Sequence, residues 1–236
     1  MKHTTLTLAL LSLTTLTNAQ EFNTFGWSGS ADLGFDRSSG NTDSTNLNVN
    51  IKAQRDWAQW ALKTQAKARF SESDDVRDAE NYYFMLQGDR KLSQKDYVFA
   101  NADYTIDNFS GYDYQATQTV GYGRELFKND AMTLNGEFGL GARQSETNTG
   151  DETTEFVARP HLDFDWQVNE LVTFTQDLKA TIGSEFTKSE SITALQSKMT
   201  ENLALKASFT AEHTSDVPAG SKELDTYTSI GVQYTF

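Results

Sequence analysis

The feature that most constrains the fold of this chain is an alternation of apolar and polar residues, repeated along nearly all of its length. It is clearest at the C-terminus, where four apolar residues stand at every second position: Ile230, Val232, Tyr234 and Phe236. A period of two is typical of a β-strand with one apolar and one polar face. We therefore interpret residues 226–236 as a strand that ends at the last residue of the sequence.

The same alternation predicts strands along the rest of the chain. Twelve strands are expected, within 27–35, 46–54, 60–70, 82–88, 98–106, 112–122, 132–142, 156–166, 172–182, 191–199, 203–211 and 226–236. The run within 191–199 shows no readable register, and the apolar faces of the other eleven carry no charged residue. The sequence offers no helix and no second layer to cover so many apolar faces. A barrel with its apolar face turned to lipid is the architecture that fits.

The connections between these strands alternate in length. Tight breaks fall near 56–59, 90–96, 127–131, 167–171 and 200–202, and mostly longer polar ones near 36–44, 71–80, 107–111, 143–154, 183–190 and 214–224. Outer-membrane barrels pair short periplasmic turns with longer outer loops. We predict an all-β, transmembrane up-and-down antiparallel β-barrel of about twelve strands, with both chain termini on the periplasmic side.

Aromatic residues agree with this topology. The four tryptophans and the C-terminal phenylalanine fall at strand ends on the predicted periplasmic side, which indicates a membrane-interface girdle of Trp27, Trp57, Trp60, Trp166 and Phe236. One residue opposes the pattern, because Pro160 lies in the middle of a strand and cannot donate a backbone hydrogen bond. We expect a β-bulge at this position.

The N-terminal segment is typical of an export signal. Lys2 gives a positive start, Leu6–Leu13 an apolar core too short for a membrane helix, and Thr17–Ala19 a small-residue cleavage site. We expect a cleaved signal peptide over 1–19 and the barrel over 20–236. Cysteine is absent, so an exported chain like this one must be held together without disulfides.

Composition excludes several classes of function. Lys and Arg number 20 against 33 Asp and Glu, a formal net charge of −13, which argues against nucleic-acid binding and against a basic face for anionic lipid. No phosphate-binding glycine loop occurs, and we predict no cofactor and no metal site. An acidic run, Glu72, Asp74, Asp75, Asp78 and Glu80, could bind divalent cations shared with lipopolysaccharide phosphates, because Ca²⁺ and Mg²⁺ prefer oxygen ligands. The run lacks the spacing of a calcium-binding loop, so we favour a solvated loop that binds no cation.

Two stretches resemble known proteins. Residues 34–47, with Ser-Gly-Asn-Thr-Asp at 39–43, resemble the opening of the YdiY-like family of salt-induced outer-membrane proteins, a family defined by a domain of unknown function. The similarity extends to the terminal Tyr-x-Phe, and the closing strand resembles the signal read by the barrel-assembly machinery, with Gly231, Tyr234 and Phe236 at its key positions. The resemblance implies the outer membrane of a Gram-negative bacterium, contact with its lipid and lipopolysaccharide, and a link to salt or osmotic stress. It implies no catalytic residue.

The alternate, polar positions of the strands should line the lumen, and many are charged. A basic stripe of Lys52, Lys63, Lys67 and Arg69 would face an acidic stripe of Asp103, Asp107, Asp113, Glu125 and Glu137. The eighth and ninth strands mix signs, with Arg159, His161, Asp163, Asp165, Asp177 and Lys179. Such a lining suits a channel for small polar solutes or ions.

Two alternatives remain open at this point. The lumen charges could pair and plug the barrel, because a twelve-stranded barrel lies between filled eight-stranded barrels and open sixteen-stranded porins. An outer-membrane hydrolase would need an activated nucleophile, and His213 beside Ser215 and Asp216 is the candidate at the outer rim. A histidine next to a serine and an aspartate in a loop is more often coincidence, so we predict that the protein is not an enzyme.

Overall fold

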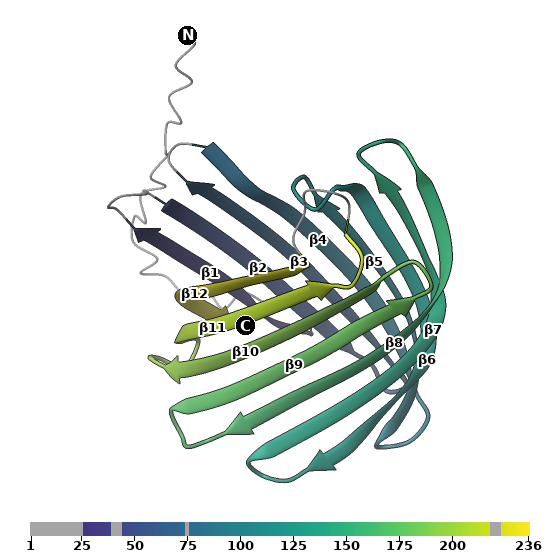
Figure 1. The fold of residues 1–236 in the computed structure, drawn as a ribbon. Coiled ribbons are helices and arrows are strands. Elements are labelled where there is room, and N and C mark those ends of the chain that lie inside the picture. Colours follow the sequence, from purple (N-terminus) through teal and green to yellow (C-terminus); the bar gives the residue numbers. More distant parts are fainter. Residues whose placement is uncertain (1–25, 39–43, 74–75, 218–222) are drawn as a thin grey trace.

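The computed structural model describes residues 26–38, 44–73, 76–217 and 223–236, and these residues form a closed antiparallel β-barrel (Figure 1). Each strand pairs with its successor in the chain, and the last strand pairs with the first. The twelve strands are β1 (Trp27–Ser38), β2 (Ser44–Asp56), β3 (Trp60–Ser73), β4 (Val76–Lys91), β5 (Asp96–Asp107), β6 (Tyr112–Lys128), β7 (Met132–Thr147), β8 (Glu152–Gln167), β9 (Val172–Gly183), β10 (Thr187–Lys198), β11 (Leu203–Thr214) and β12 (Leu224–Thr235). The prediction of an all-β, up-and-down antiparallel barrel of twelve strands is confirmed.

The structure does not describe the segment in which a signal peptide is predicted. The predicted signal peptide, 1–19, lies outside the described residues, as does the Ser-Gly-Asn-Thr-Asp motif at 39–43. Within the described residues, no helix has the length and apolar character needed to cross a membrane.

The two faces of the sheet have the environments that the alternation predicts. Large apolar side chains on the outer face are exposed, for example Val120 at 65%, Phe156 at 66% and Ile230 at 59%. Their inward-facing neighbours Thr119 and Val157 are buried. An apolar outer surface of this extent is stable in lipid, and in water it would drive association.

The tenth strand is longer than expected, and its outer face explains why its register was hidden. It begins at Thr187, so most of the segment 183–190 expected as a loop is strand. Its lumen-facing residues are Lys188, Glu190, Ile192, Ala194 and Gln196, and its outer positions are mainly Ser and Thr. Polar hydroxyl residues on the outer face remove the apolar period on which the prediction depends.

The acidic segment 71–80 is also largely strand. Strand β3 continues to Ser73 and β4 begins at Val76, with Ser71 opposite Ala79 and a register shift between Ser71 and Glu72. The expected loop is wrong here because strands that extend beyond the apolar belt need no apolar face, so their sequence looks like a loop.

The bulge predicted at Pro160 is absent. Ala158 pairs with Ile182 and His161 with Lys179 in one continuous register, although no pairing with β9 is formed at Arg159 or Pro160. On the other side, Pro160 pairs with Phe138 of β7 without interruption. The missing N–H thus interrupts one ladder locally, and the rest of the closed barrel holds the strand in register.

The barrel closes through a glycine-lined seam between β1 and β12. The pairing runs from Ser30 opposite Thr235 to Gly34 opposite Gly231, and the backbones of Gly29 and Phe236 exchange hydrogen bonds of 2.9 and 3.0 Å. A Cβ atom on Gly231 would lie 2.1 Å from the Leu33 carbonyl oxygen. Glycine at 231 therefore permits the close approach of the two end strands.

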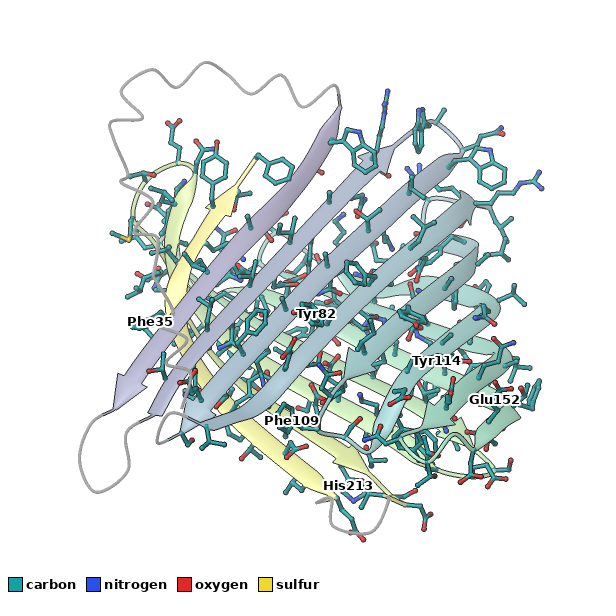
Figure 2. The ribbon with its side chains drawn as sticks, turned by 90° about the horizontal axis from the view of Figure 1, so that it is seen from above. Phe35, Tyr82, Phe109, Tyr114, Glu152 and His213 are labelled. Carbon is teal, nitrogen blue, oxygen red and sulfur yellow. The ribbon has the colours of Figure 1, made fainter. Side chains whose placement is uncertain are left out.

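The chain order gives the barrel two distinct ends. One end, here called the Trp rim, carries the start of β1 and β3 and the end of β2, β8 and β12, and therefore the residues Trp27, Trp57, Trp60, Trp166 and Phe236. The opposite end, here called the loop rim, includes Phe109 in the β5–β6 connection, Glu152 at the start of β8 and His213 near the end of β11 (Figure 2). Assignment of the Trp rim to a membrane interface stays a prediction.

Candidate functional site in the barrel lumen

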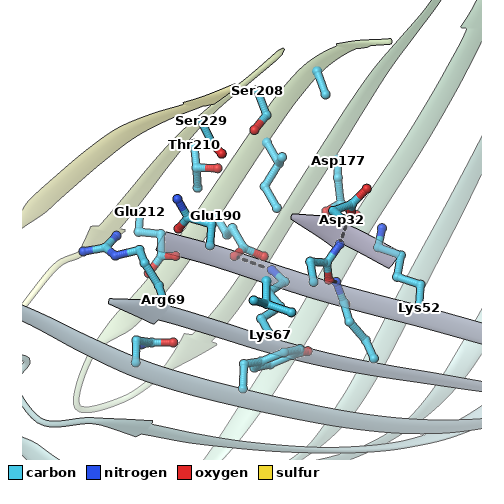
Figure 3. Close-up of a pocket in the computed structure, with 18 of the residues that line it drawn as sticks. Asp32, Lys52, Lys67, Arg69, Asp177, Glu190, Ser208, Thr210, Glu212 and Ser229 are labelled. Atoms are coloured by element: carbon cyan, nitrogen blue, oxygen red, sulfur yellow. Dashed lines mark hydrogen bonds and ion pairs between the residues drawn. The ribbon is translucent and has the colours of Figure 1, made fainter. Parts of the chain in front are cut away.

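The lumen contains an elongated cavity of ≈ 330 Å³ (Figure 3). Its lining begins near the Trp rim, at Ser30 and Asp165, and extends to Asp107 and Asp225 near the loop rim. It therefore follows the strands over most of their length. Side chains of β1–β3 and β9–β12 supply much of this lining, so the cavity is displaced towards one side of the barrel.

The residues predicted to line the lumen fall into two groups. Those that line the cavity are Lys52, Lys67, Arg69, Asp103, Asp163, Asp165, Asp177 and Lys179. The others, Lys63, Glu137, Arg159 and His161, meet one another in a separate cluster on the opposite side. Of the further acidic residues expected on β5 to β7, Asp107 lines the cavity, whereas Asp113 and Glu125 do not.

Glu137 is the centre of this second group, here called the Glu137 cluster. Its carboxylate accepts hydrogen bonds from Gln87 Nε2 at 2.9 Å, Tyr97 Oη at 2.8 Å and Arg159 Nη1 at 3.2 Å. His161 Nδ1 lies 3.4 Å away and Lys63 Nζ 4.0 Å away. The Glu137 side chain is only 7% exposed. The cluster thus joins inward-facing side chains of β3, β4, β5, β7 and β8 into a largely buried group towards the Trp rim.

A second set of charges, here called the Lys67–Glu190 bridge, crosses the cavity itself. Lys67 on β3 donates to Glu190 Oε2 on β10 at 3.0 Å, and Lys179 Nζ lies 3.2 Å from Glu190 Oε1. Both ammonium groups also lie over the ring of Tyr83, at 5.1 and 4.9 Å from its centroid. Strands β3 and β10 belong to different walls of the barrel. The bridge therefore joins two walls of the barrel across the cavity.

Further charges along the cavity are paired in the same way. Asp32 accepts from Lys206 Nζ at 3.0 Å, and also from Asn50 and Gln233, each at 2.7 Å. Towards the loop rim, Lys188 lies 3.8 Å from Glu212. Close pairs of opposite charge keep the wall strongly polar while reducing the field of each single charge.

One pair of carboxylates departs from this pattern. Asp163 on β8 and Asp177 on β9 stand directly opposite each other in the ladder, and Asp177 Oδ1 lies 3.3 Å from His161 Nε2. Among the described residues, no cation lies within ion-pair distance of Asp163 or Asp165. Like charges on directly opposed residues are unfavourable, and this wall of the cavity carries three carboxylates, those of Asp163, Asp165 and Asp177.

The expected arrangement of a basic wall against an acidic wall is only partly formed. Lys63 lies 4.0 Å from Glu137 on β7, but its shorter contact, 2.8 Å, is with Asp89 on the neighbouring strand. Lys67 pairs with Glu190 on β10, which was not among the predicted residues. The period of a strand tells which face a residue occupies, and the position of that residue along and around the barrel depends on strand stagger.

Several lumen residues were missed by the sequence reasoning. Asp32 and Lys206 occupy polar positions of correctly predicted strands and could have been selected by the same rule. Glu190 lies in the strand without a readable register, and Phe186 in a segment expected to be an outer loop. Two aromatic side chains, Tyr97 and Phe99, point inward from polar positions of β5, where no aromatic lining was expected.

The hydrolase candidate is not assembled at the loop rim. His213 is exposed and belongs to the outer face of β11, opposite Leu224. Ser215 Oγ accepts a hydrogen bond from the Thr187 N–H at 2.9 Å and lies 3.5 Å from Asp216 Oδ2. Within the described residues, no hydrogen bond joins His213 to either neighbour, so the residues needed to activate a nucleophile are not in contact.

The acidic segment offers no cation site in the described part of the chain. Asp74 and Asp75 lie outside the described residues, and the side chain of Asp78 is likewise outside what the structure describes. In the remainder, no group of three or more His, Asp or Glu side chains has the arrangement needed to hold a metal ion.

Comparison with known proteins places these features in a family. A family model described as "Protein of unknown function, DUF481" matches residues 31–236. The "Uncharacterized protein YdiY" of Escherichia coli (strain K12) is 26% identical over 208 residues, which are 88% of this chain and 82% of that protein. Among solved structures, the NanC porin superposes with a TM-score of 0.54 at 14% identity, over 87% of this chain and 98% of NanC. The KdgM porin in complex with disordered oligogalacturonate gives 0.48 at 12% identity, over 88% and 99%.

Proposed function

This chain belongs to the DUF481 family, and from that premise we propose that it is a narrow outer-membrane channel for small polar solutes and ions. The observation that carries the proposal is the elongated, charged cavity that runs along the strands from near one rim to near the other. A barrel that only had to be stable would be filled along its whole axis, as the Glu137 cluster fills part of this one.

The charges of the lining indicate the kind of solute. Among the described residues, nine carboxylates and seven cationic side chains line the cavity, a difference of two in favour of negative charge. Because several of these groups pair within 3.0–3.8 Å, the wall presents many hydrogen-bonding groups and only a weak net field. We expect weak selectivity for cations over anions and passage of uncharged polar solutes of small size.

The test is the ion current through purified, refolded protein in a planar bilayer, with the reversal potential measured in a salt gradient. Lys52 lines the cavity, and Lys52→Gln should raise the cation-to-anion permeability ratio. Lys95 is exposed in the connection before β5, and Lys95→Gln makes the same change of charge outside the lumen. Equal ratios for the two variants would contradict the proposed path.

A second candidate function is a plugged barrel that conducts nothing. It is favoured by one observation, the Lys67–Glu190 bridge, which joins two walls across the cavity. In that case folded and inserted wild-type protein gives no discrete current steps in the bilayer. Silence from protein shown to be inserted would reject the channel and favour this structural role.

The cellular setting belongs to the same proposal. We place the barrel in the outer membrane of a Gram-negative bacterium, in contact with lipid and lipopolysaccharide through its apolar outer face. The closing-strand residues Gly231, Tyr234 and Phe236 would be read by the barrel-assembly machinery, and the tryptophans of the Trp rim would lie at the periplasmic interface. Fractionation of the two membranes tests the location, and growth of a deletion strain in high salt tests the link to salt or osmotic stress.

A further inference from the structure

A short segment at the loop rim is folded into the barrel. Residues Ser184–Phe186 connect β9 to β10, and the side chain of Phe186 is only 3% exposed. A phenylalanine in a three-residue connection at the end of a barrel would ordinarily contact solvent or lipid. Here it packs against side chains that point inward from β6 and β7, so the connection occupies part of the mouth.

The Phe186 ring is held between two lumen side chains. The Arg143 guanidinium carbon lies 3.4 Å from the centroid of the ring, and the ring of Tyr112 lies 5.3 Å from it on a tilted plane. Arg143 Nη2 also donates to the Phe186 carbonyl oxygen at 2.5 Å. Cation–π attraction is strongest for desolvated arginines, so this contact stabilises the inward position of the ring.

A buried carboxylate fixes the backbone of the same segment. Glu155 Oε1 accepts from Arg143 Nη2 at 2.5 Å, and Glu155 Oε2 accepts from the Glu185 N–H at 2.8 Å. Both side chains of the Arg143–Glu155 pair are 2% exposed. Arg143 and Glu155 thus both bind the backbone of the segment while they pair with each other, as expected for a satisfied buried ion pair.

The residue before the segment is adapted to this position. A Cβ atom on Gly183 would lie 2.1 Å from Glu155 Oε2 and 2.8 Å from Arg143 Nη2. Any larger residue would push the connection away from the pair. The contact between the segment and the lumen wall is thus built from β6, β7, β8 and the connection itself.

We propose that Ser184–Phe186 is a fixed constriction at the loop rim, and that Phe186 sets the largest solute able to enter the cavity. The inference rests on the proposed channel function and deepens it by naming the residue that determines size selectivity. Arg143, which holds Phe186, itself lines the cavity, and Phe186 packs directly behind it, outside the cavity lining. Removing the ring should open the space behind Arg143 and so widen the entrance without changing its charge.

The experiment is polymer exclusion in a planar bilayer. Single-channel conductance is measured with ethylene glycol oligomers of increasing mass on the loop-rim side, and the smallest oligomer that fails to lower the current defines the size limit. Phe186→Ala should raise the conductance and shift the limit to larger oligomers. The matched control is Phe209→Ala, since Phe209 is 48% exposed on the outer face of β11.

A second variant guards against misfolding. Phe186→Leu keeps an apolar side chain in the packed position but removes the aromatic ring, and heat-modifiable migration in gels shows whether each variant is folded. Because the leucine is smaller and flexible, it should shift the limit in the same direction and by less.

The outcomes separate the two claims. A shift in the Phe186 variants with none in Phe209→Ala supports the inference, whereas a silent wild type rejects the proposed channel whether or not the variants conduct. A conducting wild type with the same limit in folded Phe186 variants overturns the size-determining role and leaves the channel intact. If wild type and folded Phe186 variants are all silent, both the channel and the constriction are rejected.

Discussion

The Lys67–Glu190 bridge leads to a prediction about charge selectivity that can be worked out from its geometry. Glu190 is shared by Lys67 at 3.0 Å and Lys179 at 3.2 Å, and its own side chain is 10% exposed. The change Glu190→Gln keeps the shape of the side chain and removes one negative charge from the place where the bridge crosses the cavity. Two ammonium groups from different walls are then left without their shared carboxylate.

The size of the effect follows from Coulomb's law. Two unit charges about 4 Å apart interact by ~1 kcal/mol in bulk water and by ~4 kcal/mol at the effective dielectric constant of a protein surface. Loss of the carboxylate raises the energy of a cation at the bridge and lowers that of an anion. Even at the water limit the difference between the two ions changes by ~2 kcal/mol, and because ~1.4 kcal/mol is tenfold, the permeability ratio should shift more than tenfold towards anions.

The assay is the reversal potential of refolded protein in a planar bilayer under a salt gradient at about 0.1 M, where screening acts over ~10 Å and leaves contacts this short largely intact. Glu170 lies exposed in the connection between β8 and β9, so Glu170→Gln is the matched control with the same change of charge. If Glu190→Gln fails to fold, the double variant Glu190→Gln with Lys67→Gln removes the repulsion between the ammonium groups of Lys67 and Lys179.

Stability provides a second readout of the same variant. Breaking a fully buried ion pair typically costs ~3–5 kcal/mol. The side chains of Lys67 and Lys179 are each 21% exposed, so water can solvate part of their charge and the cost should fall below that range. Equal permeability ratios for folded Glu190→Gln and Glu170→Gln would refute the claim that ions pass the bridge.

Two further predictions concern the filled side and the seam. Glu137→Gln should lower the free energy of unfolding in urea by ~3 kcal/mol, because it leaves Arg159 buried without its carboxylate. The cation-to-anion permeability ratio should change little, since Glu137 does not line the cavity. A large change of this ratio with unchanged stability would contradict the division of the lumen into a filled side and an open cavity. Gly231→Val should prevent formation of the heat-modifiable folded species in refolding assays, because its Cβ would lie 2.1 Å from the Leu33 carbonyl oxygen, and normal yields of folded barrel would show that the seam can adjust.

The sequence by itself determined the architecture of this protein. A strand has a period of two, and a membrane barrel must place every second residue in lipid, so the charge-free alternate positions identified eleven of the strands and their inner and outer faces. The same rule failed where its physical basis is missing. Strand β10 has hydroxyl groups on its outer face, and the rim segments of β3 and β4 extend beyond the apolar belt.

Only the tertiary structure decided which lumen residues meet. Lys67 and Glu190 are 123 residues apart, and their contact depends on the stagger and closure of twelve strands, which no local period encodes. The separation of the lumen into a filled side around Glu137 and an open cavity is likewise a property of side-chain packing. Phe186 shows the same limit of sequence-based prediction, because the residues around it in the sequence are typical of an exposed connection. In the structure, the buried ion pair of Arg143 on β7 and Glu155 on β8 holds this connection inside the barrel.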